Sequence, residues 1–300
     1  MDAGGAWRFL SRDIAGADEG ATPSSPRHNG RSTRDVRAPA YLGENDMRSR
    51  TNRLRTLTVT AALLCLGLAG IPAAAQEPEF TSEFRVQDCR FRSWGKNPFF
   101  ILKPGFQLQL EGESDGEEIA VTKTVTWDTQ LITFEIDGAP VRVRTRVLVE
   151  RETVDGELSE ISHNFYAICR PTNDVYYFGE DVDIYEDGEI VSHDGAWRVG
   201  QDAAQPGIVM PGTFLLGARY HQEVAPGIAE DRAEHVAMGL DVETPAGAFS
   251  DCVNIVDTNP LDDESEGDDK KFCPGVGLTV DEEIELVEFG FVGFDWFGHD

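Results

Sequence analysis

The sequence is poor in basic residues. Its 26 Lys and Arg stand against 54 Asp and Glu, which gives a formal net charge of −28. An acidic field of this strength repels nucleic acid and anionic lipid, so we expect neither as a partner. It is compatible with cationic ligands, with basic protein partners, or simply with a well-solvated surface.

The chain also lacks the short motifs of several enzyme and metal-protein classes. It has no phosphate-binding P-loop, no dinucleotide-binding G-x-G-x-x-G, no metalloprotease H-E-x-x-H and no RNA-binding aromatic motif. Cysteine is scarce, with 5 residues and no C-x-x-C spacing, which argues against zinc and thioredoxin-like chemistry. Clear 3.6-residue periodicity is absent, so we expect no substantial helix.

A single long apolar run occurs near the N-terminus. Residues 1–46 are rich in Gly, Pro, Ser and Arg and cannot bury a core. A basic stretch follows Met47, then the apolar segment Leu57–Ile71, which is shorter than the ~20 residues of a membrane span, and then three alanines that end at Ala75. This pattern predicts a signal peptide over 47–75, with 1–46 a mis-called or disordered extension and no membrane span after cleavage.

The remainder is typical of antiparallel strands. Asp-Gly recurs at 115–116, 137–138, 155–156, 187–188 and 194–195, and this dipeptide supplies the positive φ angles of tight hairpin turns. Between the turns apolar and polar residues alternate with period two. The predicted strands are 106–111, 117–127, 131–136, 141–152, 157–168, 175–185, 189–193, 196–199, 219–224, 249–257, 272–280 and 284–289.

These strands predict a single all-β domain over 76–289 and a C-terminal tail over 290–300. We expect an antiparallel meander that forms one strongly curved sheet, as a half-open or closed barrel, because long flat sheets are unstable. A two-sheet sandwich is the second choice. Residues 201–217 contain two prolines and several glycines and are expected to form a long loop over one end of the sheet. Residues 229–239 fit either a strand or a short helix, and 261–271 an acidic loop.

Four cysteines follow the predicted leader. An exported protein meets oxidising conditions, and an even number of cysteines indicates disulfides, although four cysteines allow three pairings. We favour Cys252–Cys273, which lie on consecutive predicted strands, and Cys89–Cys169 then follows by elimination.

Six segments resemble a family of uncharacterised bacterial exported all-β proteins. They are NPFFILKPGF (97–106), VYYFGEDVDIY (175–185), GAWRVG (195–200), PGIAEDRAE (226–234), TPAGAFSDC (244–252) and PGVGL (274–278). The resemblance covers about residues 97–288 and implies export and an all-β fold, with no established activity. That family usually carries an aromatic residue where Cys273 stands, so a Cys252–Cys273 bond would be particular to this protein.

Aromatic and polar side chains give one set of candidate ligand-binding residues. Trp127, Phe165, Tyr177 and Trp197 could line a pocket for an apolar ligand, although aromatics at strand spacing are more often core. Arg219 and His221 share one strand face beside carboxylates, where they could bind a ligand or simply form cross-strand pairs.

Four aspartates form a candidate calcium site. Asp183, Asp187 and Asp194 match positions of an EF-hand loop, and Asp181 lies close by, but Tyr185 occupies a ligand position and strands flank the loop. The alternative is a solvated hairpin.

Ser114 lies in a G-x-S-x-G sequence of the kind that carries a hydrolase nucleophile. That motif needs a helix after the serine, whereas the following residues alternate like a strand, so a hairpin turn is expected. A hydrolase would also have to bring Ser114 close to one of His163, His193 or His221.

The sequence therefore favours a non-catalytic, extracytoplasmic module that binds an apolar small molecule or a protein partner. A calcium-stabilised structural protein and a hydrolase are the alternatives.

Overall fold

The computed structural model describes residues 79–262 and 267–293. The predicted extension, signal peptide and most of the predicted tail lie outside these residues. The described part is all-β, with one short 3-10 turn at Val86–Asp88 and no α-helix. No helix within it has the length and apolar character needed to cross a bilayer.

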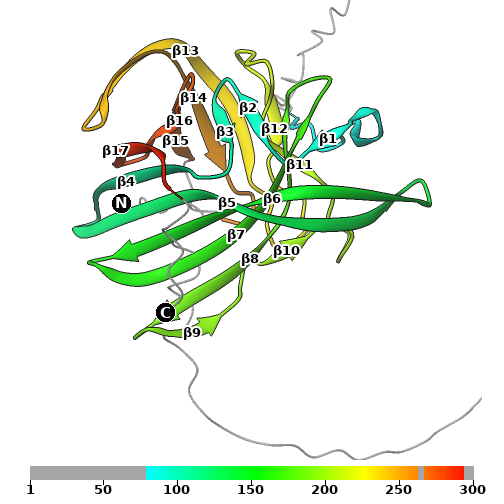
Figure 1. Ribbon diagram of the computed structural model, residues 1–300, viewed down its shortest axis with the longest axis horizontal. Helices are drawn as coiled ribbons and strands as arrows, with labels where there is room; N and C mark the ends of the chain where they lie inside the picture. Colours follow the sequence, from blue (N-terminus) through cyan, green and yellow to red (C-terminus); the bar gives the residue numbers. More distant parts are fainter. Residues whose placement is uncertain (1–78, 263–266, 294–300) are drawn as a thin grey trace, which may run out of the picture. The chain divides into compact units, whose positions relative to one another are not determined.

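Antiparallel pairing joins most of the strands into one 15-stranded sheet, in the order β10-β8-β7-β6-β5-β4-β17-β16-β15-β14-β13-β12 (Figure 1). β1, β9 and β11 also pair with strands of this sheet, and β2 and β3 pair with each other. The bounds are β1 Phe91–Arg92, β2 Gly95–Asn97, β3 Phe100–Leu102, β4 Phe106–Ser114, β5 Glu117–Ile136, β6 Ala139–Val154, β7 Glu157–Cys169, β8 Val175–Glu186, β9 Glu189–Ser192, β10 Trp197–Arg198, β11 Gly207–Met210, β12 Arg219–His221, β13 Arg232–Thr244, β14 Gly247–Thr258, β15 Asp268–Cys273, β16 Gly277–Asp281 and β17 Ile284–Phe291.

Four of the five Asp-Gly sequences form the predicted two-residue hairpin turns. At 115–116, 137–138, 155–156 and 187–188 both residues have positive φ, as the primed turns that match strand twist require. The fifth, at 194–195, lies in the connection between β9 and β10, and only Gly195 has positive φ.

The long hairpin of β5 and β6 differs from its predicted form. Instead of ending near residue 127, β5 continues through a bulge between Val125 and Thr129. The buried guanidinium of Arg146 on β6 donates hydrogen bonds to the carbonyl oxygens of Trp127 (2.6 Å) and Asp128 (3.2 Å). These bonds satisfy backbone acceptors that the bulge removes from the ladder, which explains how one strand spans 20 residues.

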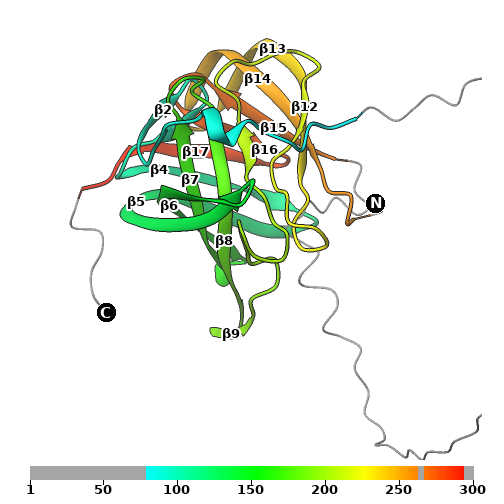
Figure 2. The ribbon, with the colours of Figure 1, turned by 90° about the vertical axis from the view of Figure 1, so that its right-hand side faces the viewer.

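A segment predicted to be loop connects strands from the two ends of the sheet order. Figure 2 shows β4 to β8 and β12 to β17 bordering one interior. Within residues 201–217, β11 pairs with β8, placing Gly207 opposite Tyr177. A Cβ atom on Gly207 would lie 2.0 Å from the carbonyl oxygen of Gln222, just after β12, so only glycine allows this approach.

Three other predicted segments are settled by the structure. Residues 232–244 form a strand, β13, rather than a helix. The expected acidic loop over 261–271 is wrong in its second half, because β15 begins at Asp268. The predicted tail is wrong at its start, because β17 continues to Phe291 and pairs with Phe106 of β4.

Both predicted cysteine pairs lie within disulfide distance. Cys252 on β14 pairs with Cys273 on β15, and Cys89 pairs with Cys169 at the end of β7. The second bond fixes the segment before β1 against the sheet, and the first residue of β1, Phe91, packs edge-on against Tyr176 and Phe178.

Candidate ligand-binding cavity

The inner face of the curved sheet lines a cavity of about 400 Å³. That volume lies within the range of ~300–1,000 Å³ typical of small-molecule sites. Residues from β3 to β8, β11 and β14 to β16 contribute to its wall, together with the segment 222–231. The cavity is therefore a product of the whole sheet rather than of one loop.

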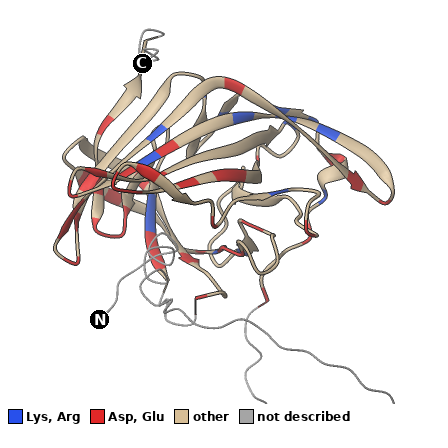
Figure 3. Cartoon of the chain, turned by 90° about the horizontal axis from the view of Figure 1, so that it is seen from below, with Lys and Arg blue, Asp and Glu red and all other residues tan. Residues whose placement is uncertain are grey.

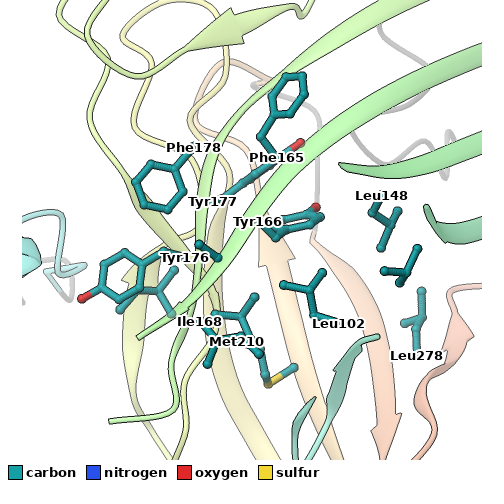
Figure 4. Close-up of a cluster of buried hydrophobic side chains, with 14 of the residues drawn as sticks. Leu102, Leu148, Phe165, Tyr166, Ile168, Tyr176, Tyr177, Phe178, Met210 and Leu278 are labelled. Carbon is teal, nitrogen blue, oxygen red and sulfur yellow. The ribbon is translucent and has the colours of Figure 1, made fainter. Parts of the chain in front are cut away.

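One part of the wall is apolar. Aromatic stacking organises it: the Tyr166 ring stacks on Tyr177 with centroids 4.6 Å apart, and Phe100 packs edge-on against Tyr166 at 5.2 Å. Figure 4 shows Tyr176 and Phe178 on the other side of β8 from Tyr166. The apolar lining residues also include Phe99, Leu108, Val125, Leu148, Phe272 and Leu278.

A bulge in β8 brings Tyr177 and Glu180 to the same face. Tyr166 lies opposite Tyr177 and Asn164 opposite Glu180, so β8 carries one extra residue between these pairs. Gly179, at φ +125°, occupies the bulge, and a Cβ atom there would lie 2.4 Å from the Trp197 carbonyl oxygen. In a regular strand two residues three positions apart point to opposite faces, so it is the bulge that lets Tyr177 and Glu180 share one face.

Asn164 fixes the two tyrosine hydroxyls of the lining. Its Oδ1 accepts hydrogen bonds from Tyr177 and, at 3.4 Å, from Tyr166. Its Nδ2 donates to Ser162 Oγ at 2.9 Å. The phenol groups are thus held in place by neighbouring side chains.

The rest of the wall is rich in carboxylates. They come from β6, β7, β8, β14 and the 222–231 segment: Glu150, Glu160, Glu180, Glu223, Asp231 and Asp257. Two lysines, Lys123 and Lys270, accompany them. Figure 3 shows the same excess of acidic over basic residues across the described chain.

Glu160 is the most isolated of these groups. It is 8 % exposed and makes no hydrogen bond or ion pair within the part of the chain that the structure describes. Glu152 of β6 lies directly opposite it in the sheet. Burial raises the pKa of Glu160 to about 9, and the negative charges of Glu152 and Glu180 add to this effect.

Glu180, Glu223 and Asp231 form a second group. Burial raises the pKa of Glu180 to about 8 and that of Asp231 to about 6, and it raises the pKa of Glu223 well above its ordinary value. The buried Trp197 Nε1 has no partner at hydrogen-bonding geometry among the described residues. It nevertheless faces Glu180 and Glu223, and this N–H lowers the pKa of both carboxyl groups against the larger effect of burial.

The two lysines pair with other carboxylates of the cavity. Lys123 Nζ lies 2.8 Å from Glu150 Oε2. Lys270 Nζ lies 3.5 Å from Asp257 Oδ2 and 3.4 Å from Asp281 Oδ1. Burial is the main cause that raises the pKa of Asp257 to about 7, and Lys270 opposes it. Both lysines thus form ion pairs with these other carboxylates, and the charges of Lys123 and Lys270 offset only a minor part of the burial effect at Glu160 and Glu223.

Of the six predicted ligand-binding residues, Tyr177 lines this cavity and the others do not. Trp127 is 39 % exposed at the β5 bulge, and Phe165 packs under the Arg198 guanidinium on the opposite face of β7. Trp197 contacts Tyr177 edge-on from behind the lining.

The remaining two predicted residues lie on β12. Arg219 forms an ion pair with Glu234 of β13 at 2.5 Å, the cross-strand pair that was the alternative to ligand binding. His221 packs against Phe80, and burial lowers the pKa of its imidazole.

The four candidate calcium ligands are dispersed. Asp181 pairs with Arg198, Asp183 contacts His193 Nδ1 at 2.9 Å, and Asp187 forms the β8–β9 turn. Asp194 borders the cavity. Within the described residues no group of three or more His, Cys, Asp and Glu side chains is arranged to hold a metal ion.

The candidate hydrolase residues lie on different elements of the fold, with Ser114 on β4, His163 on β7, His193 in the connection after β9 and His221 on β12. Ser114 ends β4 before the predicted hairpin turn, where its Oγ donates to Glu283 at 2.8 Å. His163 of β7 lies opposite Asp181 of β8, and His193 Nδ1 is 2.8 Å from the Val182 carbonyl oxygen. None of the four lines the cavity.

Comparison with known proteins returned no match, whether to a family model, to a curated protein or to a solved structure. The resemblance to exported bacterial proteins therefore stays a prediction.

Apart from Asp194, which was a candidate calcium ligand, the carboxylates of the lining were not predicted as site residues. Glu160, Ser162, Asn164 and Tyr166 alternate with the apolar Ile161 and Phe165, which is typical of a strand whose polar face meets solvent. Two features of the sequence point to this region. Gly179 stands inside a strand, which is typical of a bulge, and Tyr177 lies between two other aromatic residues.

Proposed function

We propose that this protein is a non-catalytic binding module that takes a small amphipathic molecule into the cavity of a barrel-like sheet. The observation that carries the proposal is the cavity itself, about 400 Å³ with an apolar and a carboxylate-rich part. β11 supports the barrel-like form, because it pairs with β8 while Gly207 contacts the end of β12. The alternative is that the module binds a protein partner instead of a small molecule.

Export is part of this proposal. Two cysteine pairs at disulfide distance favour an oxidising compartment, and the leader over 47–75 is typical of secretion. Expression of the full chain in a bacterium with a periplasm tests it. A mature N-terminus at Gln76 in the periplasmic or culture fraction is expected, and full-length protein retained in the cytoplasm would refute export.

Binding is tested with the neutral fluorescent probe N-phenyl-1-naphthylamine. We expect saturable binding by the wild-type protein and a loss of at least ~10-fold in affinity for Leu148→Trp, which fills the apolar part of the cavity. Leu131→Trp is the matched control, because Leu131 is 46 % exposed on the β5–β6 hairpin. Circular dichroism and the melting temperature show whether each variant is folded.

If the Leu148 variant does not fold, Val125→Phe narrows the same wall with a smaller change. Equal affinity of wild-type protein and a folded cavity-filling variant would refute binding in this cavity.

A further inference from the structure

A buried carboxyl group without a partner faces the cavity and is the starting observation. Glu160 is 8 % exposed, lines the cavity, and has neither a hydrogen bond nor an ion pair within residues 79–262 and 267–293. Buried polar groups in folded proteins are almost always bonded, so each exception needs an explanation. An absent ligand of complementary charge supplies one.

The surrounding groups point to the same ligand. The Oδ1 atoms of Asp231 and Asp257, which also line the cavity, are buried and have no hydrogen-bond partner among the described residues. Glu180 and Glu223 continue the acidic surface between Glu160 and Asp231. Glu160, Asp231 and Asp257 thus offer acceptor atoms for which the described residues provide no donor.

We infer that the ligand is an organic ammonium ion with an apolar tail, whose charged head contacts Glu160 and whose tail lies among Tyr166, Leu148 and Leu278. This inference rests on the proposed small-molecule function. An ammonium group carries donors and a positive charge, and charge-assisted hydrogen bonds to carboxylates are the stronger kind. The stacked rings of Tyr166 and Tyr177 add faces that attract cations.

Two other ligand classes fit less well. A metal ion requires several oxygen ligands converging on one point, and no such group occurs in the described part of the chain. An anion would face the carboxylates, while both lysines of the lining already pair with Glu150 or with Asp257 and Asp281. Of the three ligand classes, metal ion, anion and organic cation, the organic cation can form hydrogen bonds with the largest number of unpaired carboxylate oxygens in the wall.

Binding should release a proton near neutral pH. Burial raises the pKa of Glu160, so the carboxyl is protonated in the free protein at pH 7. When R–NH₃⁺ binds, the O–H bond of Glu160 breaks, the carboxylate stays beside the ammonium ion and the proton goes to the buffer. Among the described residues, the charged and titratable groups that face this site are Lys123 on β5, Glu150 and Glu152 on β6, Tyr166 on β7, Tyr177 and Glu180 on β8, Asp194 after β9, Glu223 and Asp231 after β12, Asp257 on β14, Asp262 after β14, Lys270 on β15 and Asp281 on β16.

Isothermal titration calorimetry with three probes of one tail length tests the inference. n-Octylamine is the cation, n-octanol the neutral analogue and octanoate the anion, each titrated at pH 7.5 into protein with both disulfides formed. We expect octylamine to bind at least ~10-fold more tightly than octanol, octanoate more weakly than either, and octylamine binding to release protons when buffers of different ionisation enthalpy are compared.

Glu160→Gln removes the charge and keeps the shape. We expect it to weaken octylamine binding at least ~10-fold, to abolish most of the proton release, and to leave octanol within about twofold. Glu157→Gln is the control, because Glu157 is exposed at the start of the same strand and is not part of the lining.

The outcomes separate the two proposals. Octanol that binds as tightly as octylamine would refute the cation inference and leave small-molecule binding standing. No binding of any probe would refute both. Octylamine preferred equally by wild type and Glu160→Gln would show that the charge is recognised elsewhere, and it would refute the assigned site.

Discussion

Replacing Glu160 with glutamine should stabilise the folded protein at neutral and alkaline pH. Glu160 is buried beside other carboxylates and has no partner among the described residues, so its ionised form is unfavourable in the fold. Its pKa is about 9 in the folded protein against an ordinary value of 4.5. Glutamine resembles the protonated glutamic acid side chain in shape and hydrogen bonding, but it is neutral at every pH and does not ionise when the protein unfolds.

The folded protein binds the Glu160 proton more tightly than the unfolded chain does, and this difference decides how stability changes with pH. Because the folded pKa is raised, the contribution of Glu160 to stability is fully present below pH 4.5 and is lost as the pH rises towards 9. At pH 7 the unfolded chain gains about 3 kcal/mol by ionising this group, and at pH 5 it gains less than about 1 kcal/mol. Glu160→Gln has no ionisable group at this position, so its unfolded state does not gain this free energy.

Urea or thermal denaturation at pH 5 and pH 7 measures the effect. The melting temperature of Glu160→Gln should exceed that of the wild type by ~6–12 °C at pH 7 and by far less at pH 5. Glu157→Gln, exposed on the same strand, should change neither value. A Glu160 variant that is less stable than wild type at pH 7 would show that the ionised carboxylate is favourably paired in the folded protein, contrary to the structure.

Three further predictions concern the backbone, a disulfide and a buried histidine. Gly179→Ala should cost about 2–4 kcal/mol in denaturant unfolding, since φ is +125° and the new Cβ would clash, whereas Gly290→Ala meets open space and should cost less than about 1 kcal/mol; equal costs would contradict the bulge. Replacing Cys252 and Cys273 with alanine opens a link that spans 21 residues and should cost about 3 kcal/mol, and an unchanged melting temperature would mean that the bond is not formed in solution. Burial lowers the pKa of His235 to about 4, so its contribution to stability is present above pH 6.5 and is lost as the pH falls towards 4; His235→Gln should reduce this acid sensitivity, and an unaltered pH profile would count against it.

Local chemistry made much of the fold predictable. Asp-Gly turns and period-two patterning identify most hairpins, and adjacent strands identify the Cys252–Cys273 pair, because each depends on residues close in sequence. β11 was missed because its pairing with β8 is supported by a long-range contact at Gly207 rather than by its own pattern.

The cavity was less predictable for a related reason. A polar strand face normally meets solvent, and apart from Gly179 and Tyr177 nothing local distinguishes Glu160 or Glu180 from the many exposed carboxylates of an acidic chain. The cavity that this face lines involves strands far apart in sequence, from β3 to β16, so a local pattern does not reveal it. Of the four aromatic residues predicted to line a pocket, Tyr177 does so, whereas Phe165 and Trp197 are buried elsewhere and Phe165 lies on the opposite face of its strand from Tyr166.

The ends of the 15-stranded sheet bear on how the protein behaves at high concentration. The terminal strands are short, with two residues in β10 and three in β12, and the β9 hairpin arm has four. Where β13 extends past β12, its pairing with β14 contains three register shifts, and this part of the strand carries Asp241 and Glu243. Short, bulged and charged edges offer another copy of the chain little backbone to extend, so the same sheet that encloses a cavity also resists edge-to-edge aggregation.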